Sequence, residues 1–180
     1  MTVEEFRQID STFNESMFLT KVGNVFVKLF TAIMMDKLED VDHFVGDSVM
    51  EYAERIASSA RNAGHRQMYD ELNVKDSQIS EITEEDSVYK IKVYLQSRYM
   101  DYIISLDDGA FVSGNDQSRI QVNYYLTFTK KKDANKQGIV RKCPGCGAAI
   151  SVNTTGKCEY CGSIYNQEDY DWVLTELEVC

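Results

Sequence analysis

Histidine is scarce in this chain, and the two that occur, His43 and His65, stand far from each other and from the cysteines. Histidine is the side chain most often used for proton transfer near neutral pH and is a frequent metal ligand. Its scarcity therefore argues against a histidine-based catalytic or metal centre. We expect both histidines at surface or helix-end positions, and no nucleophile–base arrangement is visible elsewhere in the sequence.

A targeting leader and an unbroken apolar run are also lacking. Acidic residues near the start, Glu4 and Asp10, are unlike those of a signal peptide or an arginine-rich transit peptide. The most apolar stretch, residues 17–35, is interrupted by Lys21 and Lys28 and falls short of a membrane span. We therefore expect a cytoplasmic protein without a transmembrane helix, and peripheral contact with a membrane stays open.

Positive charge is in short supply, because 19 basic residues face 29 acidic ones for a net charge of −10. This balance argues against broad phosphate binding and against simple adhesion to anionic lipid. One local cluster departs from it, and the sequence predicts a solvated linker there, with nucleic-acid or lipid contact as the alternative. The cluster consists of Lys130, Lys131, Lys132, Lys136, Arg141 and Lys142.

Four cysteines in two C-x-x-C pairs carry the clearest chemistry in the sequence: Cys143, Cys146, Cys158 and Cys161. Each pair places two thiolates one tight turn apart, and a short spacer lets one ion gather all four. A glycine follows each pair and permits the backbone to turn toward the sulfurs. The pattern predicts a closed, tetrahedral, structural site for one zinc ion, because a catalytic zinc keeps an open position for water.

Two other chemistries fit the same cysteines. Two local disulfides would close strained small rings and would need an oxidising compartment. Iron in a rubredoxin-like site uses the same four-thiolate geometry. The fifth cysteine, Cys180, is the last residue, and we expect a free thiol there without a role.

The hydrophobic pattern changes from helical to alternating along the chain. Apolar residues at intervals of three and four predict a long amphipathic helix from Asn14 to about Lys37. Ser48 and Glu51 suggest a capping box that opens a second helix, which ends at Gly64. Alternating runs then predict antiparallel strands, beginning near Leu72 and ending near residue 130. Such an order of helices before strands indicates an α+β domain in which a curved antiparallel sheet wraps over the helices.

We divide the chain into an α+β domain at residues 1–130, a basic linker at 131–138, a four-cysteine ribbon at 139–166 and a C-terminal strand or tail at 167–180. The ribbon is too small to bury a core, so metal binding must supply its folding free energy. The tail alternates like a strand and is expected to pair with the ribbon or the sheet.

Particular segments resemble the bacterial Tim44-like proteins that bear a zinc ribbon. The resemblance rests on the strands from Tyr94 to Tyr102 and from Tyr124 to Phe128, on the two cysteine pairs with their neighbours, and on the run from Tyr170 to Leu174. It covers residues 13–178. It implies a cone-shaped fold similar to nuclear transport factor two, followed by the ribbon, and a link to protein transport or membrane-associated assembly. Many bacterial relatives carry a membrane anchor before the domain, and the start at Met1 leads us to expect none here.

The first functional hypothesis is a non-enzymatic protein-binding or scaffold module with a structural zinc ion and a protein partner that the sequence does not identify. Tyrosines of the predicted sheet would supply aromatic anchors or fill the core. They are Tyr89, Tyr94, Tyr99, Tyr102, Tyr124 and Tyr125.

Two alternatives remain beside it. The first is a small-molecule or acid–base enzyme in the cone, for which Asp101 beside Tyr99 and Tyr102 is the only candidate, although we expect an outward, solvated Asp101. The second is nucleic-acid contact by the ribbon, which the acidic balance disfavours. The oligomeric state is not indicated by the sequence.

Overall fold

The computed structural model describes residues 1–132, 140–142, 146, 149–151, 158, 160–162 and 172–180. Helices precede strands, as the sequence pattern predicts, and the last strand follows the cysteine region. The elements are α1 (Val3–Ile9), α2 (Glu15–Met35), the short 3-10 helix η1 (Leu38–Asp40), α3 (Asp47–Asn62), β1 (His65–Glu84), β2 (Val88–Ser105), β3 (Phe111–Gly114), β4 (Ile120–Lys131), β5 (Val140–Lys142), β6 (Ala149–Ser151) and β7 (Val173–Val179).

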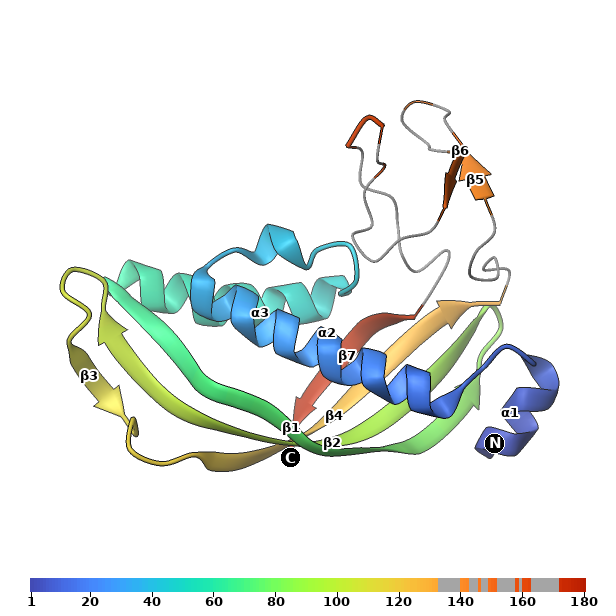
Figure 1. Cartoon of the computed structure of the whole chain (residues 1–180), viewed down its shortest axis with the longest axis horizontal. Coiled ribbons are helices and arrows are strands. Elements are labelled where there is room, and N and C mark those ends of the chain that lie inside the picture. The colour runs from blue at the N-terminus through green and yellow to red at the C-terminus, as the bar shows by residue number, and fades with distance from the viewer. Residues whose placement is uncertain (133–139, 143–145, 147–148, 152–157, 159, 163–171) are drawn as a thin grey trace.

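A five-stranded antiparallel sheet forms the body of the molecule. Its order is β1-β2-β4-β7, and β3 pairs with the part of β2 that extends beyond β4. The long strands curve, and α2 and α3 lie on one face of the sheet (Figure 1). The chain is therefore an α+β protein with helices against a curved antiparallel sheet. The tail prediction is also confirmed in its sheet form, because β7 pairs with β4.

The core forms where the inward faces of α2, β2 and β4 meet. In β2 the alternation predicted from the sequence is observed, with Ile91, Val93 and Leu95 fully buried. The facing side of α2 contributes Val22, Phe26, Leu29 and Phe30. Burial of these apolar side chains supplies the main favourable free energy of folding.

Helix α2 combines the length and composition of a membrane span with a face buried in the folded chain. Its 21 residues are long and apolar enough to span a membrane by length and composition, so the prediction that this stretch falls short of a span is wrong on those criteria. The same apolar stripe is buried against the sheet in the folded chain. Asn14 lies directly before the helix and caps it, because its side chain accepts a hydrogen bond from the Met17 amide at 2.9 Å.

The start of α3 differs from the prediction. The helix begins at Asp47 after Gly46, and no side chain caps it. The Ser48 hydroxyl, which we expected to form a capping box with Glu51, donates instead to the carbonyl of Thr175 at 2.9 Å. The Gly46 amide donates to the Leu174 carbonyl at 2.7 Å. Contacts to β7, which follows the cysteine region, therefore decide where α3 starts.

A capping box does occur at the first helix, which the sequence analysis missed. The Glu5 amide donates to the Thr2 hydroxyl at 3.2 Å, and the Thr2 amide donates to the Glu5 carboxylate at 2.7 Å. Helix α1 is anchored by Phe6, whose ring is fully buried and lies 5.2 Å from Tyr89 and 6.1 Å from Trp172. This short helix closes one end of the sheet.

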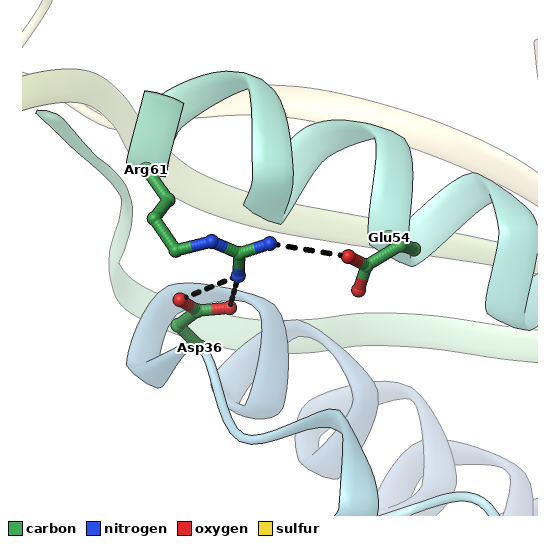
Figure 2. A network of polar contacts seen from close by, with 3 residues as sticks. All are labelled: Asp36, Glu54 and Arg61. Atoms are coloured by element: carbon green, nitrogen blue, oxygen red, sulfur yellow. Dashed lines mark hydrogen bonds and ion pairs between the residues drawn. The ribbon is translucent and has the colours of Figure 1, made fainter. Parts of the chain in front are cut away.

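The opposite end of the helical layer is joined by an ion-pair network. Asp36 ends α2 in a left-handed conformation with φ of 55°, and its carboxylate accepts two hydrogen bonds from Arg61 of α3 at 2.7 and 2.8 Å. Arg61 also reaches Glu54 at 3.2 Å (Figure 2). The network is exposed, so it orients the two helices with little effect on stability.

Two local predictions need correction. His43 is buried rather than at the surface, and its ring centroid lies 4.6 Å from that of Phe44. The neighbouring residues Phe44 and Val45 are bound to Leu174 of β7. The first strand starts at His65 rather than near Leu72, because Gly64, with φ of 72°, turns the chain directly from α3 into β1.

Candidate metal centre

Three of the four predicted ligands come together in the structure. The sulfur atoms of Cys146, Cys158 and Cys161 all lie within 4.8 Å of one another, and those of Cys146 and Cys158 are 3.9 Å apart. Zinc–sulfur bonds of about 2.3 Å in a tetrahedron place neighbouring sulfurs about 3.8 Å apart. The three thiols therefore fit one ion, and Cys143 lies outside the described residues.

Local backbone structure explains why the two cysteine pairs can meet. The first pair lies in the connection between β5 and β6, which form an antiparallel two-stranded sheet from Val140↔Ser151 to Lys142↔Ala149. The second pair ends in a tight turn at Gly162, where φ is 72° and the amide donates to the Cys158 carbonyl at 2.9 Å. This turn brings Cys158 and Cys161 to the same side. Cys158 is buried, whereas Cys146 and Cys161 are exposed.

The described part of the cluster offers three sulfur ligands, those of Cys146, Cys158 and Cys161. Soft thiolates select zinc, copper(I) or iron–sulfur chemistry rather than magnesium or calcium. This cluster could hold a metal ion, and its arrangement suits a structural role because no histidine or carboxylate of the described residues shares it.

A second group of polar side chains lies in the core, where three buried tyrosines, Tyr69, Tyr99 and Tyr124, meet. The hydroxyls of Tyr99 and Tyr124 are 2.8 Å apart, and the rings of Tyr69 and Tyr99 lie 5.2 Å apart. Burial is the main cause that raises the pKa of Tyr99 to about 12, and it raises the pKa of Tyr69 and Tyr124 further. All three phenols are therefore protonated at neutral pH, and they serve as packing and hydrogen-bonding groups.

Asp101 does not point outward as predicted. It lies opposite Tyr69 in the β1–β2 register, on the face that carries Tyr99, and it is half-buried. Gln67 donates to its carboxylate at 2.7 Å. The space beyond it is filled by rings, since Phe30 lies 4.8 Å from Tyr69 and 5.5 Å from Tyr124. This packing supports a core role for the tyrosines, and the hydrogen bond from Gln67 fixes the Asp101 carboxylate.

The comparisons with known proteins identify the family. The sequence profile described as the Tim44-like domain matches residues 1–139. The chain belongs to the Tim44-like family. The Tim44-like match ends before Cys143, so all four cysteines of the two pairs lie outside it.

Solved structures also match this chain. No curated protein matches the chain. Among solved structures, the intermembrane space region of the chloroplast protein ARC6, known from a crystal structure, is similar over 99% of this chain and 96% of its own, at 10% identity and a TM-score of 0.39. The family assignment rests on the Tim44-like match alone.

The basic cluster is not simply a solvated linker in this Tim44-like protein. Lys130 lies 3.4 Å from Asp10 and 5.8 Å from the centre of the Trp172 ring. Lys132 lies 2.7 Å from Glu84. These two lysines therefore join the sheet to the N-terminal segment and to β1, which leaves fewer of the predicted positive charges for nucleic acid. Lys130 lies within β4, which extends to Lys131, and Lys132 directly follows the strand.

Acidification should loosen this junction. Burial alone would raise the pKa of Asp10. Hydrogen bonds from Thr12 and the nearby Lys130 ammonium outweigh this effect and hold the pKa below its usual 3.8. Its stabilising contribution is complete above that usual value and is lost as the pH falls through the lower folded-state pKa. We expect the fluorescence of Trp172 to change below about pH 4 and the change to be reduced in Asp10→Asn. An identical pH profile in this variant would contradict the assignment.

Proposed function

We propose that this Tim44-like protein is a non-enzymatic module that binds another protein and is reinforced by one structural zinc ion. The convergence of three thiols within 4.8 Å supports the metal part. Cys143 would complete the tetrahedron in this proposal. Zinc would contribute a rigid cross-link between the two cysteine pairs and no chemistry on a substrate.

The distribution of aromatic side chains supports the binding part. Rings on the helical side of the sheet are buried against α2, whereas no helix among the described residues covers the opposite face (Figure 1). On that face Tyr94 and Tyr125 are half-buried with ring centroids 5.4 Å apart, and Lys92 lies 4.7 Å from the centre of the Tyr125 ring. Tyrosine is enriched among the residues that dominate protein–protein binding.

Metal content is tested by elemental analysis of protein purified without added metal. The proposal expects one zinc ion per chain. Iron at the same stoichiometry would correct the identity of the ion and keep the structural role. Protein without stoichiometric metal, with its cysteines oxidised in pairs, would contradict the metal site.

Protein binding is tested by cross-linking in the native cell at natural expression. A photoreactive amino acid replaces Tyr94 on the uncovered face, and a matched control replaces Lys37, which is exposed on the helical side. We expect a discrete cross-linked protein at Tyr94 and a weaker product at Lys37. No protein product at either position would argue against a binding module.

Cell fractionation addresses the location. The proposal places the protein in the cytoplasm, because thiols that bind one metal ion must stay reduced. Recovery with membranes that is reversed by salt would add peripheral contact.

A further inference from the structure

The two edges of the sheet are built very differently. Edge strand β1 is interrupted by three register shifts, and Glu71 within it has a positive φ of 51°. Charged side chains occur along its whole length, at Arg66, Asp70, Glu71, Lys75, Asp76, Glu81 and Glu84. Bulges and charges are the devices by which proteins prevent an edge from pairing with another chain. Strand β1 is therefore protected.

The other edge carries fewer such devices at one end of the sheet, where the pairing of β3 with β2 has one register shift, between Ile103 and Ile104. Strand β7 covers β4 from Tyr124 to Thr129, and its last contact is the Cys180 amide donating to the Asn123 carbonyl at 2.9 Å. Residues 120–122 pair with β2 on their inner side, and in the described part of the chain no strand pairs with their outer side or with the outer side of β3. We call these two stretches, residues 111–114 and 120–122, the open edge.

Apolar side chains are exposed along the open edge, which carries no charged residue. Phe111 is 51% exposed, Val112 43% and Ile120 38%. Phe111 also lies 6.5 Å from the ring of Tyr102 on β2. An uncharged, apolar edge is the type of strand that adds an extended segment from another chain.

Strand β3 is held firmly in position for such pairing. Gly114 has a φ of 100°, and a Cβ atom there would lie 2.4 Å from the Asp101 carbonyl oxygen. The Asn115 amide donates to the same carbonyl at 2.8 Å, and the Ser105 amide donates to the Ala110 carbonyl at 2.8 Å. Because these contacts preorganise the edge, a partner strand would lose less entropy on docking.

The charge around the open edge favours one kind of binding partner over another. The connections that flank β3, residues 105–118, contain Asp107, Asp108 and Asp116 and no basic residue. Two basic side chains lie nearby and are engaged by other groups, since Arg119 lies 3.7 Å from Glu71 and the Lys75 ammonium donates to the side chain of Gln121 at 3.5 Å. A second copy of this chain would bring equal negative charges together, whereas a cationic segment would be attracted.

We propose that the open edge binds an extended, positively charged segment of a partner protein by strand addition. Backbone hydrogen bonds to β3 would give affinity, apolar side chains of the segment would contact Phe111, Val112 and Ile120, and its basic residues would face the flanking carboxylates. The inference rests on the proposed protein-binding function and names the surface and the chemistry of the partner.

Synthetic peptides test the proposal on the full chain. The probe is a short peptide of alternating lysine and valine with blocked ends, and its control has glutamate in place of each lysine. We expect the lysine peptide to bind at low ionic strength and to slow amide hydrogen exchange in β3 and residues 120–122. Equal binding of the glutamate peptide, or protection along β1 instead, would overturn the proposal.

Edge variants make the test specific. Val112→Lys adds a charge to the open edge and should weaken peptide binding at least about 10-fold. Gln78→Lys adds the same charge to exposed β1 and should leave binding unchanged. The isosteric double variant Asp107→Asn with Asp116→Asn should weaken peptide binding about 3-fold and reduce the salt dependence of binding. This double variant replaces Val112→Lys as the test if Val112→Lys does not fold. Equal weakening by Gln78→Lys, or no effect of the aspartate pair, would overturn the proposal.

Two further outcomes separate this inference from the function it rests on. In the first outcome, the lysine peptide fails to bind, and the partner cross-linked at Tyr94 is still captured by the Val112→Lys variant. This outcome would overturn the open edge as the binding surface and keep the protein-binding function. A dimer in sedimentation experiments that Val112→Lys dissociates would show that a second copy occupies the edge, and it would also overturn the cationic segment.

Discussion

Replacing Phe30 with alanine should lower the free energy of unfolding by about 3–5 kcal/mol, because it removes a large ring from the centre of a packed aromatic cluster. Phe30 is fully buried in α2. Its ring lies 4.5 Å from that of Phe26, 4.8 Å from Tyr69 and 5.5 Å from Tyr124. The rigid sheet beneath can only partly close the cavity, so both transfer and packing energy are lost.

Denaturant unfolding followed by circular dichroism measures this loss. Phe111→Ala is the matched control, since the same ring on β3 is about half exposed and its removal should change stability by less than about 1 kcal/mol. Equal destabilisation by the two variants would contradict the placement of the core between α2 and the sheet.

Replacing Cys158 with serine should remove the bound metal and unfold the ribbon. Cys158 is the buried member of the thiol cluster, and its sulfur lies 3.9 Å from that of Cys146. A serine hydroxyl is a poor zinc ligand at neutral pH, and a module of this size relies on metal binding for about 10 kcal/mol of folding free energy. We expect metal content to fall from one ion per chain to nearly none.

The same variant should leave the helix-and-sheet body folded. Strand β7 follows the cysteines but pairs with β4 from Tyr124↔Val179 to Thr129↔Val173, and α3 bonds to it through Gly46. If the ribbon unfolds, β7 remains attached through a longer flexible loop, and doubling a loop's length costs only about 0.6 kcal/mol. Elemental analysis and thermal unfolding measure the two effects, with Cys180→Ser as the control because that thiol is exposed. Full retention of metal, or melting of the body, would contradict the prediction.

Sequence reasoning succeeded where a pattern repeats over many residues. The spacing in α2 and the alternation in β2 and β4 predicted which faces are buried, because each period is a direct consequence of helix or strand geometry. It also recognised the four cysteines, three of which the fold brings together. Short signals were less reliable, since α1 has only seven residues and Ser48 is engaged by Thr175 rather than by its own helix.

Several side chains acquired their surroundings from segments distant in sequence. Asp101 was expected in solvent but receives a hydrogen bond from Gln67, which is 34 residues away. Lys130 was expected in a solvated basic cluster at the end of the domain but pairs with Asp10 across 120 residues. No local pattern contains these pairs, because they arise only when β2 meets β1 and when the N-terminal segment closes over the end of β4.

The amino-acid sequence alone determined the α+β class, the buried face of the long helix and the thiol cluster, since these follow from periodicity and from the chemistry of cysteine. The tertiary structure alone decided which edge of the sheet is protected and which is open. That distinction depends on strand order and on where β7 stops along β4, and both are set by packing between distant segments rather than by any single stretch of sequence.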